Sequence, residues 1–215
     1  MEEINLAREK LVEELVALGY LKDRRIVQAM LRVPRHLFVP SSYRSAAYED
    51  TPLPIGYNQT ISAPSMIATM LEELKVGEGD KVLEVGTGSG YNAALLAELA
   101  GEKGLVCTIE RIPGLVAFAR ENLRRAGYGK VKVLEGDGTL GYEKLAPWDK
   151  IIVTAAAPEI PRPLLEQLRV GGRLVAPVGS KGYQELMVAE KTGKHIKIER
   201  KGGCIFVPLI GRYGW

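Results

Sequence analysis

Residues 82–90 read Val82-Leu83-Glu84-Val85-Gly86-Thr87-Gly88-Ser89-Gly90, a short apolar run that leads into three alternating glycines. This pattern predicts a strand over 81–85, a tight turn at the glycines and a helix over 91–100. Glycines at such a turn allow a ligand to approach the backbone closely. A tight turn that binds nothing would use the same glycines, so the motif alone is weak evidence for a binding site.

The alternation of apolar runs and helical segments continues towards the C-terminus. We expect strands at 105–110, 131–134, 150–154 and 173–178, with helices at 113–126 and 161–168 between them. Such βαβ units predict an α/β fold with a doubly wound, mostly parallel sheet. The segment 186–210 predicts further strands, an antiparallel member among them, joined by turns at Thr192-Gly193 and Gly202-Gly203.

The N-terminal side of the glycine turn predicts helices and one long loop. We expect helices over 5–18, from an N-cap at Asp23 to about residue 31, and from about Ala63 to residue 74. No charged residue occurs between Thr51 and Leu71. A solvated linker would carry charge, so we expect this uncharged loop to lie against the body of the protein.

Composition limits the possible function classes. A chain of 215 residues with 46% hydrophobic and 26% charged residues fits one soluble α/β domain. The net charge of +3 is spread over interleaved basic and acidic residues, so we expect no nucleic-acid partner. The charged N-terminal end and the absence of a long apolar run predict neither a signal peptide nor membrane insertion. Cys107 and Cys204 lack paired spacing, which predicts a reducing, cytoplasmic compartment and no zinc site.

Acidic residues stand at or after the ends of three predicted strands. Glu84 lies at the first of these ends, and Glu110 lies 24 residues after Gly86 (110 minus 86), near the spacing at which a carboxylate receives ribose hydroxyls. Gly136-Asp137-Gly138 exposes a third carboxylate, which could accept from an adenine amino group. Glu110 could instead form an ion pair with Arg111 or a neighbour, and Gly136-Asp137-Gly138 could be a turn without a ligand. A carboxylate at Glu84 disfavours a pyrophosphate and favours a cationic ligand.

These features resemble the S-adenosylmethionine site of class I methyltransferases. Further segments resemble the protein-L-isoaspartate O-methyltransferases in particular, and the similarity covers nearly the whole chain. It departs from the family pattern at Ile210-Gly211-Arg212-Tyr213. The segments that carry the resemblance are Val33-Pro34-Arg35-His36-Leu37-Phe38-Val39-Pro40, Thr60-Ile61-Ser62-Ala63-Pro64, Trp148-Asp149 and Leu168-Arg169-Val170-Gly171-Gly172-Arg173-Leu174.

The resemblance implies a Rossmann-like fold and methyl transfer from S-adenosyl-L-methionine, with S-adenosyl-L-homocysteine as product. The acceptor would be the free carboxylate of L-isoaspartyl residues in damaged proteins, and the family extends this to D-aspartyl residues. Ser62 matches the active-site serine, with Thr60 and Ala63 beside it in the peptide site. The cofactor contacts implied are Ser65, Met66, Glu84, Gly86, Thr87, Gly88, Glu110, Asp137 and Gly138.

The resemblance also implies one methyltransferase domain over 1–215. Its parts would be N-terminal helices and a substrate loop (1–80), a cofactor-binding core (81–180) and C-terminal strands (181–215). We expect a monomer whose partners are isoaspartyl peptides and proteins. The acceptor carboxylate is already ionised at neutral pH, so no strong base is needed, and we expect His36 and His195 to be structural or solvated.

Four alternatives remain open. A dinucleotide-dependent oxidoreductase shares the sheet and the ribose acid but wants glycine at position 91, where Tyr91 stands. A methyltransferase acting on RNA or a small molecule would use residues 51–64 differently. A noncatalytic binding module is disfavoured by the complete set of glycines and acids. Ser62 could instead serve as the N-cap of the following helix.

Overall fold

The computed structural model describes residues 2–215 and contains a seven-stranded sheet. Its strand order is β5-β4-β3-β6-β7-β8-β9. The first five strands in this order are parallel, whereas β8 and β9 are antiparallel to their neighbours. The strands are β3 (Lys81–Val85), β4 (Leu105–Glu110), β5 (Lys132–Glu135), β6 (Trp148–Val153), β7 (Leu168–Gly179), β8 (Gln184–Thr192) and β9 (His195–Cys204). The predicted α/β fold with a mostly parallel sheet and C-terminal strands is confirmed.

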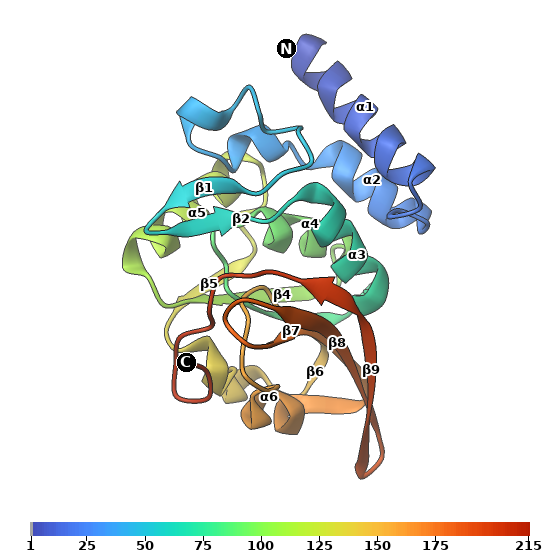
Figure 1. The fold of residues 1–215 in the computed structure, drawn as a ribbon, viewed down its shortest axis with the longest axis vertical. Helices are drawn as coiled ribbons and strands as arrows, with labels where there is room; N and C mark the ends of the chain where they lie inside the picture. The colour runs from blue at the N-terminus through green and yellow to red at the C-terminus, as the bar shows by residue number, and fades with distance from the viewer. Residues whose placement is uncertain (1) are drawn as a thin grey trace.

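Helices cover both faces of this sheet, as Figure 1 shows for α3 and α4 on one side and α6 on the other. None of the helices within residues 2–215 is long and apolar enough to cross a membrane. Asp23 caps α2 as predicted, since its side chain accepts from the backbone N–H of Arg25. The helices are α1 (Glu2–Ala17), α2 (Arg24–Arg32), α3 (Pro64–Leu74), α4 (Tyr91–Ala100), α5 (Pro113–Arg125) and α6 (Arg162–Gln167), with short 3-10 turns at Arg35–Leu37, Ser41–Tyr43, Gly138–Leu140 and Glu143–Leu145.

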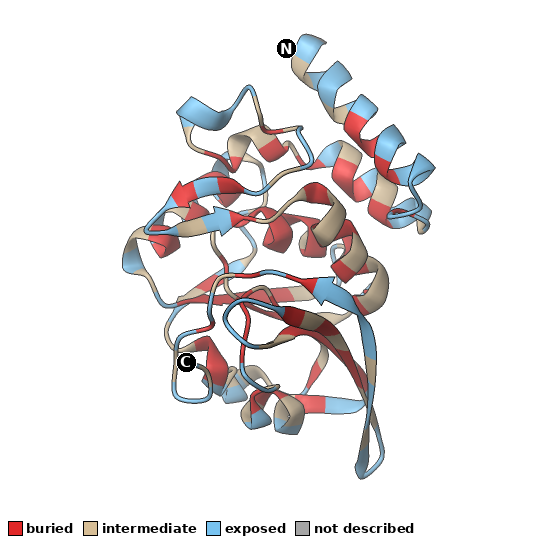
Figure 2. Cartoon of the chain, in the orientation of Figure 1, coloured by how far each residue is buried: buried red, intermediate tan, exposed pale blue. Residues whose placement is uncertain are grey.

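The core divides along the two faces of the sheet because side chains alternate along each strand. Val82 of β3 belongs to the apolar cluster that contains α3, α4 and α5. Leu83 and Val85 belong to the second cluster, which contains Leu164 of α6. Figure 2 shows the buried residues concentrated in the middle strands and the facing helices. The glycine turn after β3 therefore rests on a rigid base.

Two predictions of local structure were wrong. The predicted loop before α3 contains a two-stranded antiparallel hairpin, β1 (Leu53–Gly56) and β2 (Gln59–Ile61). Its turn places Tyr57 and Asn58 at φ 53° and 57°, left-handed values that fit a tight hairpin turn. Gly202-Gly203 is not a turn but lies within β9, where the pairing with β8 is irregular. Of the other predicted elements, β3, β4 and α4 have the predicted bounds, and the rest are present with shifted ends.

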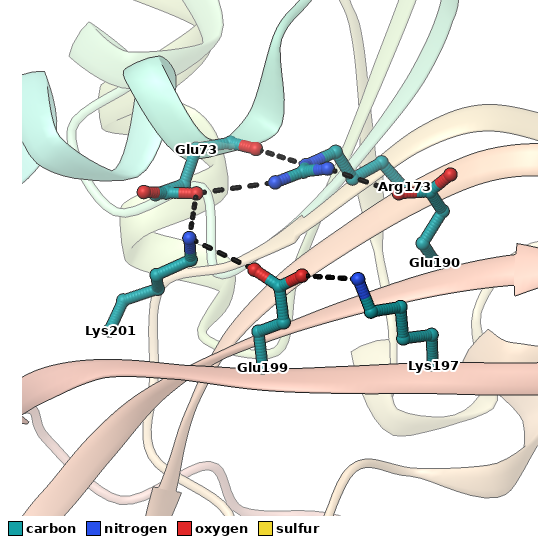
Figure 3. A network of polar contacts seen from close by, with 6 residues as sticks. All are labelled: Glu73, Arg173, Glu190, Lys197, Glu199 and Lys201. Atoms are coloured by element: carbon teal, nitrogen blue, oxygen red, sulfur yellow. Dashed lines mark hydrogen bonds and ion pairs between the residues drawn. The ribbon is translucent and has the colours of Figure 1, made fainter.

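A network of ion pairs fastens α3 to the C-terminal strands (Figure 3). The carboxylate of Glu73 on α3 lies 3.2 Å from the guanidinium of Arg173 on β7 and 3.4 Å from the ammonium of Lys201 on β9. Both cations have further carboxylate partners on β8 and β9. The whole network is Glu73, Arg173, Glu190, Lys197, Glu199 and Lys201.

Candidate active site

A cavity opens at the carboxyl ends of β3, β4 and β6, where the chain crosses from one half of the sheet to the other. Open α/β sheets bind their ligands at this switch point. The enclosed space is about 1010 Å³, its open mouth included. Segments from four parts of the chain line it, namely 59–62, 84–89 with 91–92, 109–112 and 207–210, together with Ile67, Met70, Leu115, Gly138, Thr154 and Ala155.

The glycine turn forms one wall of the cavity. Gly86 and Gly88 have φ values of +96° and +54°, which L side chains rarely adopt. A Cβ at Gly86 would lie 2.5 Å from the hydroxyl of Thr154, the residue that follows β6. That hydroxyl donates a hydrogen bond to the carbonyl oxygen of Gly86 at 2.6 Å. The turn is thus held against the neighbouring strand, and its bare backbone faces the cavity.

The carboxylate of Glu110 lies across the same turn. One of its oxygens accepts from the backbone N–H of Gly88 and the other from that of Ile112, both at 3.0 Å. Each carboxylate oxygen has a second lone pair, so two acceptor positions remain for the two hydroxyls of a diol. Glu110 is 7% exposed, which limits competition from water. The geometry therefore fits the ribose role predicted for this residue.

Glu84 lines the cavity from below the turn and is fully buried. Its carboxylate accepts from the amide of Asn92 at 2.7 Å and from the hydroxyl of Thr108 at 2.6 Å. The Thr108 hydroxyl in turn lies 2.7 Å from that of Thr87 in the glycine turn. Because burial outweighs the two hydrogen bonds, the pKa of Glu84 is raised to about 7. This chain of polar groups fixes the turn from beneath.

The predicted peptide-binding residues lie opposite the glycine turn. Thr60 and Ser62 line the cavity, whereas Ala63 is not among its lining residues. Ala63 is the N-cap of α3 and has no side-chain capping bond, so the interpretation of Ser62 as the cap was wrong. The hairpin also reaches the glycine turn, because the side chain of Ile55 lies 3.3 Å from where a Cβ at Gly88 would be.

Three predicted cofactor contacts lie outside the lining of the cavity. Ser65 donates its backbone N–H to Asp50, and Met66 packs against the apolar core. Asp137 accepts from the backbone N–H of Arg212 and of Thr139. Burial raises the pKa of Asp137, but these hydrogen bonds outweigh burial and hold the pKa below its ordinary value.

The neighbour of Asp137, Gly138, does line the cavity. A Cβ at Gly138 would lie 2.5 Å from the side chain of Val85, so only glycine fits there. The structure therefore brings Thr60, Ser62 and Gly138 together with Glu84, Gly86, Thr87, Gly88 and Glu110 around one cavity.

Sequence reasoning missed the wall formed by residues 207–210. This tail is pinned to the segment after β6, since the backbone N–H of Leu209 donates to the carbonyl oxygen of Ala156 at 2.7 Å and the N–H of Ala156 donates to that of Val207 at 2.8 Å. The indole N–H of Trp215 donates to the same carbonyl oxygen of Ala156 at 3.2 Å. The small residues after β6 thus serve close packing at Ala156, while Ala155 faces the cavity. The signal for this wall in the sequence was the run of small residues that follows β6, Thr154-Ala155-Ala156-Ala157-Pro158.

Comparison with known proteins identifies the family of this chain. A family model described as protein-L-isoaspartate(D-aspartate) O-methyltransferase matches residues 6–214. The chain belongs to this family. The isoaspartate methyltransferase family and the enzyme class predicted from the sequence are thereby confirmed.

Individual isoaspartate methyltransferases are similar in sequence to this chain over nearly its whole length. A protein-L-isoaspartate O-methyltransferase from Methanopyrus kandleri is 57% identical over 211 residues, covering 97% of this chain and 93% of that protein. One from Hyperthermus butylicus is 55% identical and covers 97% of this chain and 90% of its own.

Two solved structures share the fold over nearly the whole chain at lower sequence identity. A protein-L-isoaspartate O-methyltransferase superposes with a TM-score of 0.87 at 34% identity, covering 96% of this chain and 67% of that one. A Plasmodium falciparum protein described as a putative family member, solved in complex with S-adenosyl-L-homocysteine, has a TM-score of 0.86 at 29% identity, covering 94% of this chain and 98% of its own.

Proposed function

We propose that this chain transfers a methyl group from S-adenosyl-L-methionine to the free carboxylate of L-isoaspartyl residues in damaged proteins, the first step of their repair. The observation that carries this proposal is the shared cavity in which Ser62 faces the glycine turn and Glu110. Membership of the isoaspartate methyltransferase family supports the acceptor and the cofactor.

The residues of the cavity fit S-adenosylmethionine. Gly86, Gly88 and Gly138 leave spaces that a Cβ could not enter without a close contact or backbone strain. Glu110 has two free acceptor positions for the ribose, and the buried carboxyl of Glu84 suits a cationic ligand better than a phosphate. Asp137 lies outside the lining beside Gly138, and its Oδ2, which within residues 2–215 accepts only from the N–H of Arg212, would receive the adenine amino group. When bound, this cofactor supplies an electrophilic methyl group on a sulfonium.

The protein's own task is then to orient the acceptor. A carboxylate at neutral pH is ionised and needs no base to become a nucleophile. The hydroxyl of Ser62 would hold it by a neutral hydrogen bond, which leaves more electron density on the attacking oxygen than an ion pair would. His36 bonds the hydroxyl of Tyr48 at 2.8 Å and His195 is exposed on β9, in keeping with the structural or solvated roles predicted. Holding the reactants in near-attack geometry can lower the barrier by several kcal/mol.

The organisation of the chain supports the same assignment. We propose a single methyltransferase domain, in which residues 1–80 supply the substrate side, 81–180 the cofactor side and 181–215 the last wall. Its partners would be isoaspartyl peptides and proteins, and D-aspartyl residues would be further substrates. Cys107 and Cys204 are both free thiols, which supports a reducing, cytoplasmic location. We also propose that the protein is a monomer.

The decisive experiment measures transfer of labelled methyl from S-adenosylmethionine to a short peptide that contains L-isoaspartate. The same peptide with ordinary L-aspartate is the control. We expect base-labile label on the isoaspartyl peptide alone. If neither peptide is labelled while S-adenosylhomocysteine still binds, the acceptor assignment is wrong. If binding is absent as well, the assignment of the cofactor cavity is wrong.

A further inference from the structure

Arg35 is a fully buried arginine that joins segments far apart in the chain. It lies in the short 3-10 turn Arg35–Leu37. Its Nε donates to the carbonyl oxygen of Ala47 and its Nη2 to the carbonyl oxygen of Ser62, both at 2.9 Å. The second bond holds the peptide plane between Ser62 and Ala63, and so restricts the direction in which the Ser62 side chain leaves the backbone.

The same guanidinium lies over the ring of Tyr91, 5.0 Å from its centroid. Tyr91 is the first residue of α4, directly after the glycine turn, and it lines the cavity. One side chain therefore contacts both the backbone of Ser62 and the helix that begins at the proposed cofactor turn. It connects the two halves of the site that must be brought into register.

The charge of Arg35 persists despite its burial. Burial lowers the pKa of Arg35 to about 10, which leaves the group protonated at neutral pH. Burying a charged group is unfavourable unless other contacts compensate it. Here two backbone carbonyls accept hydrogen bonds and an aromatic face contacts the cation, while Nη1 has no hydrogen-bond partner among residues 2–215. A planar guanidinium can serve all three at once, whereas a lysine ammonium cannot match that fork geometry.

We propose that Arg35 is a positioning residue for methyl transfer, which sets the position of Ser62 relative to the glycine turn without touching either reactant. The proposal rests on the proposed function of the cavity. Displacement of a reacting group by about 1 Å can slow an enzyme about 100-fold. Loss of the two guanidinium hydrogen bonds to Ala47 and Ser62 should therefore affect turnover more than cofactor binding.

The first test is Arg35→Lys, with Arg173→Lys as matched control. Arg173 is also mostly buried and donates to a backbone carbonyl, that of Glu73, but the cavity lining does not include it. We expect Arg35→Lys to lower kcat on the isoaspartyl peptide about 10- to 100-fold. Its Kd for S-adenosylhomocysteine should change less than about twofold. Arg173→Lys should lower Tm and leave kcat within about twofold, with all assays run well below the lowest Tm.

The second test repeats Arg35→Lys in a Ser62→Ala background as a double-mutant cycle. If Arg35 acts through Ser62, the further loss of kcat should shrink to less than about threefold. An equal loss in both backgrounds would refute the proposal while leaving the proposed function intact. If Arg173→Lys lowers kcat as much as Arg35→Lys does at a similar loss of Tm, the effect is one of stability, and the proposal is refuted too.

The variants could fail to fold, or the unaltered protein could fail to label the isoaspartyl peptide. If Arg35→Lys does not fold, Arg35→Gln replaces it in both tests, and failure of both variants to fold would make Arg35 a structural residue and overturn the proposal. If the unaltered protein does not label the isoaspartyl peptide, the proposed function fails first, and the role of Arg35 in it fails with it.

Discussion

The carboxylate of Asp50 accepts a hydrogen bond from the backbone N–H of Ser65 at 2.8 Å, across 15 residues of chain. Ser65 is the second residue of α3, whose own N-cap position, Ala63, provides no side-chain acceptor. Asp50 therefore acts as a cap from a distance and satisfies one of the free N–H groups at the start of this helix. The same residue stabilises the point at which the Ser62 segment enters the helix.

Replacement of this distant cap should destabilise the protein. We expect Asp50→Ala to lower the free energy of unfolding by about 1 kcal/mol, the usual effect of removing a capping side chain. Asp50→Asn keeps an acceptor oxygen and should lose less. Urea denaturation of both variants measures the difference. Equal stability of Asp50→Ala and the unaltered protein would show that the helix start needs no side-chain acceptor.

The Ser62 hydroxyl should matter for turnover and not for cofactor affinity. We expect Ser62→Ala to lower kcat about 10- to 100-fold, the effect of losing a hydrogen bond to a charged group. Its Kd for S-adenosylhomocysteine, measured by calorimetry, should stay nearly unchanged. Ser45→Ala, at an exposed position away from the cavity, is the matched control. Loss of cofactor binding in Ser62→Ala would contradict the role assigned to the hydroxyl.

Glu110 should govern cofactor affinity. In Glu110→Gln one carboxylate oxygen becomes an amide donor, which cannot accept from both a ribose hydroxyl and a backbone N–H. We expect the Kd for S-adenosylhomocysteine to rise about 10- to 100-fold in calorimetry. Glu135 lies beside Glu110 in the strand register, at the end of β5, but it is exposed. Glu135→Gln is therefore the control. Equal affinities of both variants would remove Glu110 from the cofactor site.

Glu84 should make stability depend on pH. Its pKa is about 7 in the folded protein, against an ordinary value of 4.5, chiefly because of burial. The folded state therefore holds this proton longer than the unfolded state does. The stability that the protonated carboxyl provides is complete below about pH 4.5 and is lost as the pH rises through 7. At about 1.4 kcal/mol per unit of pKa, the loss amounts to about 3 kcal/mol.

Glu84→Gln should remove this dependence. The amide can still accept from Asn92, and the Thr108 hydroxyl can turn to accept from it and donate towards Thr87. Denaturation without ligand at pH 4, 6 and 8 should show the variant gaining stability over the unaltered protein as the pH rises. A constant difference between the two proteins at all three pH values would mean that burial does not raise the pKa of Glu84.

The sequence predicted the parts of this protein whose structure is decided locally. The strand before Gly86 and the helix after Gly90 follow from periodicity and glycine chemistry, and both occur where expected. The hairpin of residues 53–61 was missed because its turn contains Tyr57 and Asn58 at positive φ instead of the usual glycine. Turn preferences alone therefore do not predict this hairpin. In the structure its Ile55 side chain packs against the glycine turn at Gly88.

The predicted site was incomplete for a similar reason. Glu84 and Glu110 were found because strand ends of a parallel sheet meet at one edge. The wall at 207–210 depends on where β9 returns the chain, and Arg35 could not be distinguished from a surface arginine. Long-range contacts such as that of Arg35 with Ser62 leave no periodic signal in the sequence.

The wall at 207–210 also bears on the order in which the protein is made. Residues 59–115 supply the glycine turn, Glu110 and Ser62, and they leave the ribosome while the chain beyond them is still being synthesised. The cavity stays open on one side until β9 has emerged and Leu209 has bonded to Ala156. Because Thr154 after β6 also holds the glycine turn, a nascent chain completes the walls of its cavity only after β9 has joined the sheet.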